Sequence, residues 1–169
     1  MTILRIVLLC LLAGMGLKAQ AQRTLVPIVS FHDIPVTVAT QARLTNDDVK
    51  NAFLAAGEEA KWQIVPTGDG VLEATYVKQN KHTIMVTIRY DAQKYSVLFK
   101  GSDNMKQRIG QPMSEAVAAA AESKQRQLFA ARPETPYLKA DPQAVIHPFY
   151  EHWVYDLLER VRLKLSRTP

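Results

Sequence analysis

Four consecutive segments, at residues 62–66, 71–78, 82–90 and 94–100, alternate apolar and polar residues with a period of two. Such alternation is typical of β-strands that bury one face. Short polar turns separate the segments, and the first of them, at 67–70, carries two glycines that allow the positive φ angles of a hairpin. The pattern therefore predicts a four-stranded antiparallel meander with one buried face. The residues expected on that face are Trp62, Ile64, Leu72, Ala74, Tyr76, Ile84, Val86, Ile88, Tyr90, Tyr95, Val97 and Phe99.

Two amphipathic segments flank the alternating runs and supply apolar faces that can cover a sheet. Thr45 is a predicted helix N-cap, and Asp48 stands where a capping box requires a polar partner. The apolar residues that follow have helical spacing, which predicts a helix over residues 46–60. A last helix is expected from Pro148 onward, because proline is tolerated in the first helical turn. Its apolar stripe contains Tyr150, Trp153, Val154, Leu157, Leu158, Val161 and Leu165.

These elements predict a single α+β domain over residues 44–169. Its expected architecture has two layers, with the N-terminal and C-terminal helices packed on one face of the four-stranded meander. An alanine-rich segment at 113–132 predicts a further helix, and the four prolines of 132–148 indicate a loop. We interpret residues 106–147 as a helical insertion into the domain.

Residues 22–43 precede the domain and contain short β-branched runs between Pro27 and Pro35. Proline cannot donate a hydrogen bond within a central β-ladder. We therefore expect this segment to be an extended arm or an edge strand.

The N-terminus has the pattern of a secretory signal peptide over residues 1–21. Arg5 precedes an apolar run at 6–17, and Ala19-Gln20-Ala21 provides small residues for cleavage near Ala21. The apolar run is shorter than the roughly 20 residues that a bilayer-spanning helix needs. We therefore expect a periplasmic protein without a transmembrane span after cleavage; a retained anchor, a lipid anchor and secretion into the medium are the alternatives.

Cys10 is the only cysteine of the chain, and it lies inside the apolar run of the predicted signal peptide. No small residue stands just before it, which disfavours its use as a lipidation site. Cleavage would remove it, so the mature chain would have neither disulfides nor thiolate chemistry. The net charge of +5 is spread along the chain and indicates no nucleic-acid partner.

The sequence contains no recognisable catalytic or metal-binding motif, and we expect neither an enzyme nor a cofactor. His147 and His152 are five positions apart, whereas a metal-binding helix needs ligands one turn apart. His147 is expected instead at the cap of the last helix. A hydrolase would require either that histidine pair or His82, Ser102 and Asp103 to converge.

The outer face of the predicted meander is mostly polar but carries four apolar residues. If they lie together, they form a patch that another surface should cover. The alanine-rich helix is one candidate cover, and an envelope protein is the other. We therefore interpret the chain first as a non-catalytic interaction module of the cell envelope. The four candidate binding residues are Val65, Val77, Met85 and Leu98.

A small-ligand carrier is the alternative function. Its ligand would lie between the sheet and the last helix, near Tyr150 and Trp153. The spacing of these two aromatic residues also fits simple burial in the core, which is the more frequent role of such a stripe.

Several short motifs within residues 44–105 and 149–162 resemble those of a known family. They are Leu44-Thr45, Val49, Ala56-Gly57, Trp62-Gln63-Ile64, Gly70-Val71-Leu72-Glu73-Ala74-Thr75, His82, Val86-Thr87-Ile88-Arg89-Tyr90, Tyr95-Ser96-Val97, Ser102, Asn104-Met105, Tyr150 and Trp153. In these positions the chain resembles small proteobacterial exported proteins and predicted lipoproteins of unknown function. The resemblance implies a cell-envelope location and an order of helix, four strands and helix, but no activity. The chain differs from the family in lacking a lipid-anchoring cysteine near the cleavage site and in the length of its segment 106–143.

Overall fold

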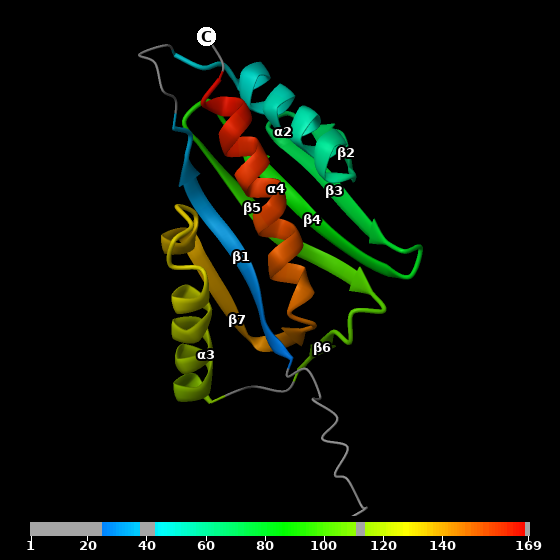
Figure 1. Ribbon diagram of the computed structural model, residues 1–169, viewed down its shortest axis with the longest axis vertical. Coiled ribbons are helices and arrows are strands. Elements are labelled where there is room, and N and C mark those ends of the chain that lie inside the picture. The colour runs from blue at the N-terminus through cyan, green and yellow to red at the C-terminus, as the bar shows by residue number, and fades with distance from the viewer. Residues whose placement is uncertain (1–24, 38–42, 111–113, 168–169) are drawn as a thin grey trace, which may run out of the picture.

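A curled seven-stranded antiparallel sheet forms the centre of the computed structural model, which describes residues 25–37, 43–110 and 114–167 (Figure 1). The strand order is β2-β3-β4-β5-β1-β7-β6. The α+β class is confirmed, but the prediction of a four-stranded sheet was wrong by three strands. The strands are β1 (Val26–Pro35), β2 (Trp62–Gly68), β3 (Val71–Lys78), β4 (His82–Tyr90), β5 (Lys94–Asp103), β6 (Arg108–Ile109) and β7 (Leu138–Ile146).

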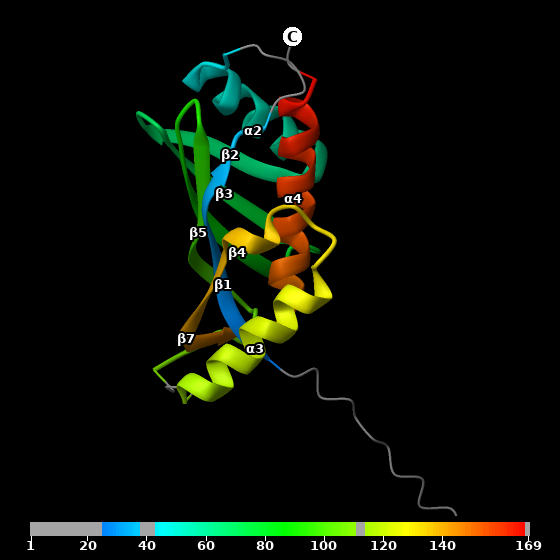
Figure 2. The same cartoon turned by 90° about the vertical axis from the view of Figure 1, so that its left-hand side faces the viewer.

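All the helices of the described residues lie on one side of this sheet (Figure 2). Helices α2 (Asn46–Ala60) and α4 (Phe149–Leu165) pack against each other, as Figure 1 shows. Helix α3 (Glu115–Leu128) and a 3₁₀ turn, η1 (Thr135–Tyr137), lie beside α4 over β1 and β7. No helix within the described ranges is long and apolar enough to cross a membrane.

The strands β2 to β5 pair in sequence order, as the alternating pattern predicts. Leu72 faces Ile88 across β3 and β4, and Ile88 faces Val97 across β4 and β5, so apolar residues align on the helix side. Leu72, Ile88 and Val97 are completely buried. The N-terminus of α2 also forms as expected, because Thr45 and Asp48 make a reciprocal capping box.

Strand β1 corrects the expectation of an arm or edge strand, because it lies between β5 and β7 in the interior of the sheet. Val29 and Phe31 have no exposed surface, and the ring of Phe31 meets that of Tyr155 on α4 at 5.0 Å. The two prolines occupy the ends of the strand. Pro27 lies next to a shift of register against β7, and Pro35 is the last residue of the strand. Their missing N–H groups therefore do not interrupt the central hydrogen bonds.

Strand β7 corrects the interpretation of 132–148 as a loop and of 106–147 as an insertion. It pairs with β1 along most of its length, and Leu138, Ala144 and Ile146 are buried in the common core. The register jumps between the pairs Pro27↔Val145 and Ile28↔Asp141, which leaves Pro142 in a bulge. A bulge residue needs no ladder hydrogen bond, so the proline is tolerated there.

Helix α3 is held mainly by polar side chains, because few of its own residues are apolar and buried. Its Arg126 donates hydrogen bonds to the carbonyl oxygens of Thr135 (3.0 Å), Pro136 (3.2 Å) and Leu138. Its Glu122 accepts a hydrogen bond from the backbone N–H of Ala140, at 3.4 Å. The helix therefore lies along the outer edge of β7 and does not cover the opposite face of the sheet.

Gln125 is the buried residue of α3, and it joins that helix to β1 and α4. Its Nε2 donates to the carbonyl of Pro27 at 3.3 Å and to the carboxyl group of Glu151 on α4. Glu151 is 3% exposed, and burial raises its pKa from 4.5 to about 7, against a smaller lowering by the hydrogen bond from Gln125. The folded protein therefore holds a proton that the unfolded chain releases between these two values.

We expect the change in unfolding free energy caused by Glu151→Gln to be more favourable at pH 8 than at pH 4.5, by about 1–3 kcal/mol. The wild-type contribution is fully present below pH 4.5 and is lost as the pH rises through about 7, where the folded carboxyl ionises. The side-chain amide of the variant is neutral at every pH, so its contribution to stability does not change over this range. Urea unfolding at pH 4.5, 6 and 8 measures the effect.

Glu159→Gln is the matched control, because Glu159 lies on the same helix with an exposed side chain. Its unfolding free energy should follow that of the wild type across the pH range. Parallel pH curves for the wild type and Glu151→Gln would contradict the assignment.

Candidate functional site

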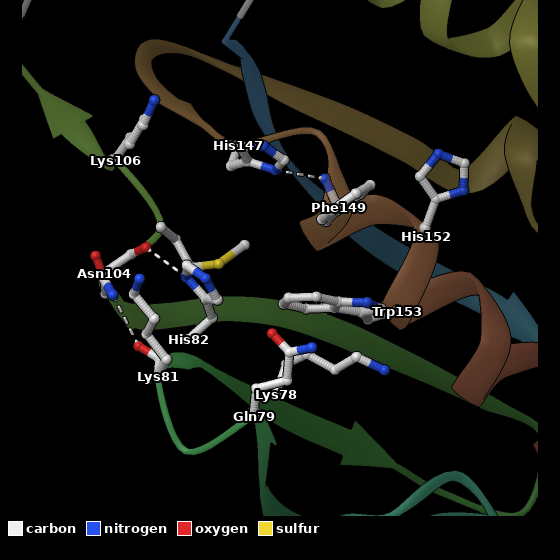
Figure 3. A pocket seen from close by; sticks show the side chains of 11 residues that line it. Lys78, Gln79, Lys81, His82, Asn104, Lys106, His147, Phe149, His152 and Trp153 are labelled. Carbon is white, nitrogen blue, oxygen red and sulfur yellow. Dashed lines mark hydrogen bonds between the residues drawn. The ribbon is translucent and has the colours of Figure 1, made fainter. Parts of the chain in front are cut away.

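A cavity of about 670 Å³ lies between the β3–β4 turn, the segment after β5 and the N-terminus of α4 (Figure 3). Helix α2 packs near the β2 edge, so this corner of the helix side of the sheet is covered by α4 alone (Figure 1). Side chains from all three segments surround the cavity. They are Lys78, Gln79, Lys81, His82, Asn104, Met105, Lys106, His147, Phe149, His152 and Trp153.

The β3–β4 turn forms one wall, and it is a tight three-residue loop between the paired residues Lys78 and His82. Gln79 and Asn80 have φ angles of 54° and 50°, and the N–H of Lys81 donates to the carbonyl of Lys78 at 3.0 Å. Positive φ at both central residues is the geometry that matches the twist of a hairpin. The turn thereby presents Lys78 and Lys81 at the two ends of the loop, beside the cavity.

The segment from Asn104 to Lys106 connects the other two walls. The carbonyl of Asn104 accepts a hydrogen bond from Nδ1 of His82 at 2.8 Å, and its Nδ2 donates to the carbonyl of Lys81 at 3.1 Å. The carbonyl of Met105 accepts from the backbone N–H of His147, at 3.0 Å. Both sides of the cavity are therefore fixed to one backbone segment, whose Asn104 has a φ of 55°.

The start of α4 supplies an aromatic wall. Nδ1 of His147 accepts a hydrogen bond from the backbone N–H of Phe149 at 3.2 Å, although the N-cap residue is Pro148 and His147 lies one position before the predicted cap. The rings of Phe149 and Trp153 lie 5.9 Å apart, and Trp153 packs on Tyr76 of β3 at 5.0 Å. Phe149 is 42% exposed, so an apolar ring faces solvent at the cavity.

The polar lining of the cavity carries positive charge only. Lys78, Lys81 and Lys106, which Figure 3 labels, are exposed; the first two flank the β3–β4 turn and the third follows β5. Among the described residues, no aspartate or glutamate lines the cavity. Asp103 precedes the connecting segment but pairs with Thr83, a position on the outer face of the sheet.

The four predicted docking residues occupy the outer face but do not form a continuous patch. Val65 and Val77 are 44% and 47% exposed, whereas Met85 and Leu98 are half-buried. Each lies opposite a polar residue on the neighbouring strand, namely in the pairs Val65↔Glu73, Val77↔Thr83, Thr75↔Met85 and Thr87↔Leu98. The apolar side chains therefore alternate with polar ones.

The two predicted ligand residues separate in the structure. Tyr150 is completely buried, and its hydroxyl donates to the carbonyl of Val29 at 2.7 Å, which is a structural role; Tyr150 does not line the cavity. Trp153 does line it. The contact between His82, considered above only for hydrolysis, and Asn104 could not be predicted, because it joins positions 22 residues apart.

The groups considered for hydrolysis are engaged in other contacts. Ser102 donates its hydroxyl hydrogen to Gln107 at 2.8 Å, and His82 donates to the carbonyl of Asn104. Within residues 25–37, 43–110 and 114–167, no group of three or more His, Cys, Asp or Glu side chains is placed to hold a metal ion. The described arrangement is thus suited to binding through apolar contact and positive charge.

Comparison of the chain with protein-family models, with curated proteins and with solved structures gives no significant match. The resemblance to exported proteins of unknown function stays a prediction. The predicted signal peptide, residues 1–21, and Cys10 within it lie outside the described residues.

We expect Asn104→Ala to destabilise the protein by about 1–2 kcal/mol, because it loses the hydrogen bond to Lys81 and places a less tolerant residue at positive φ. Asn104→Gly loses the same hydrogen bond but accepts the φ angle without strain. The glycine variant should therefore be the more stable of the two in urea unfolding. An alanine variant as stable as the glycine variant would contradict a backbone constraint at this position.

Proposed function

We propose that this chain is a non-catalytic exported protein that binds a small molecule with an apolar body in the cavity beside α4. The observation that carries the proposal is the cavity itself, because its volume of about 670 Å³ falls within the range of small-ligand sites. Met105, Phe149 and Trp153 offer apolar contact, and amine and imidazole groups surround them. Such a combination is typical of ligand pockets.

The cavity is also held by well-defined contacts, which supports a binding role. The backbone of Asn104 and Met105 is tied by hydrogen bonds to both the β3–β4 turn and the start of α4. A cavity with fixed walls loses little conformational entropy when a ligand enters. Residues 1–21 favour action outside the cytosol, so we propose a periplasmic carrier or receptor of a small molecule.

Binding of an envelope protein through the outer face is the second candidate function. The exposure of Val65 and Val77 supports it. The polar residues that lie opposite each apolar residue argue against it, because docking surfaces generally have contiguous apolar area. The neighbouring rings of Phe149 and Trp153 therefore make the cavity the stronger candidate.

We expect Phe149→Asp to weaken binding of the neutral fluorescent probe N-phenyl-1-naphthylamine by about tenfold or more. The new carboxylate would lie on the cavity wall. An apolar ligand would have to remove the water bound to this carboxylate, which is unfavourable. Aspartate at the first position of α4 is compatible with the helix dipole, so the fold should be retained. Titration of the probe, followed by its emission, measures the affinity.

Val77→Asp is the matched control, because it places the same charge at a similarly exposed apolar position on the outer face. Its probe affinity should stay within about twofold of the wild type. Equal losses in both variants, or no binding by the wild type, would refute the proposed site.

A further inference from the structure

We propose that the natural ligand of this cavity is a free organic anion, with an apolar body against Phe149 and Trp153 and its acidic group among Lys78, Lys81 and Lys106. This inference rests on the proposed binding function and specifies its ligand class. Carboxylates, sulfonates and phosphate monoesters share the required charge. Figure 3 shows the residues that would make both kinds of contact.

The first argument is the sign of the charge around the opening. Three lysines line the cavity, and none of its lining residues within the described ranges is an aspartate or a glutamate. Four of the seven other described lysines pair with carboxylates, among them Lys94 with Asp33 and Lys100 with Glu73. The three cavity lysines form no ion pair with any described residue. Their potentials therefore add at the opening and attract an anion.

The second argument is the origin of the three lysines. Lys78 ends β3, Lys81 follows the tight turn, and Lys106 follows the segment bonded to that turn through Asn104. Lys106 has a φ of 53°, in the left-handed region, next to Met105, whose carbonyl accepts a hydrogen bond from His147. The three backbone positions are therefore set by the same contacts that build the cavity, and the charge and the apolar wall belong to one site.

The experiment compares 8-anilinonaphthalene-1-sulfonate with N-phenyl-1-naphthylamine, two dyes that share one aromatic framework and differ by a sulfonate. We expect the purified protein to bind the sulfonate at least about tenfold more tightly at low ionic strength. That preference should shrink as salt is added, because the lysines are exposed and therefore screened. Equal affinities, or a preference that salt leaves unchanged, would overturn the inference.

The combined variant Lys78→Gln, Lys81→Gln and Lys106→Gln tests which charges are responsible. It should lose most of the preference for the sulfonate and keep its affinity for the neutral dye. The control variant Lys61→Gln, Lys124→Gln and Lys139→Gln removes the same charge from exposed positions that do not line the cavity. An equal loss in the control would show a general charge effect and would overturn the assignment.

These results separate the inference from the function on which it rests. If both dyes bind equally, the ligand is not selected by charge, and only the inference fails. If neither dye binds, the proposed function fails and the inference fails with it. A last experiment uses two competitors, and we expect free dodecanoate to displace the sulfonate dye. If only phosphatidylglycerol vesicles displace it, the lysines bind a lipid surface, and the inference of a free anionic ligand fails.

Discussion

The structure depends on strand β1, which hydrogen-bonds along both of its edges and so joins β2–β5 to β6–β7. Its Val29 and Phe31 lie in the core under α4, and the hydroxyl of Tyr150 bonds directly to its backbone. This hydrogen bond satisfies the buried carbonyl of Val29, which would otherwise lose its contact with water without compensation. This contact also fixes where α4 begins, and the start of α4 is one wall of the cavity.

Local patterns were sufficient to predict the elements whose partners are near in sequence. The period-two runs indicated β2 to β5, and Thr45 with Asp48 indicated the start of α2, because these signals need only neighbouring residues. Strand β7 and the interior position of β1, which was predicted as an extended arm or an edge strand, were missed for a physical reason. Their prolines indicated interruptions of a strand. In the structure, Pro27 and Pro142 adjoin a shift in register where no ladder hydrogen bond is needed. That placement depends on pairing between strands more than a hundred residues apart in the sequence.

The candidate site was predictable only in part. Trp153, one of the two residues proposed from the sequence to contact a ligand, lines the cavity, and His147 lies one position before the N-cap residue Pro148. Tyr150 occupied the same apolar stripe but turned toward β1, because a helix distributes neighbouring positions around its circumference. The contacts of Asn104 and Met105 join three segments that lie apart in the chain, so no periodic pattern could reveal the cavity.

The polar contacts of α3 have a consequence for self-association. An exposed strand edge is a template on which a second chain can add. Arg126 and Glu122 occupy the carbonyl of Leu138 and the N–H of Ala140 on the margin of the sheet. The alanine-rich helix thus leaves two fewer backbone groups of β7 free to pair with a second strand, and it does so through two hydrogen-bonding side chains with little buried apolar surface of its own.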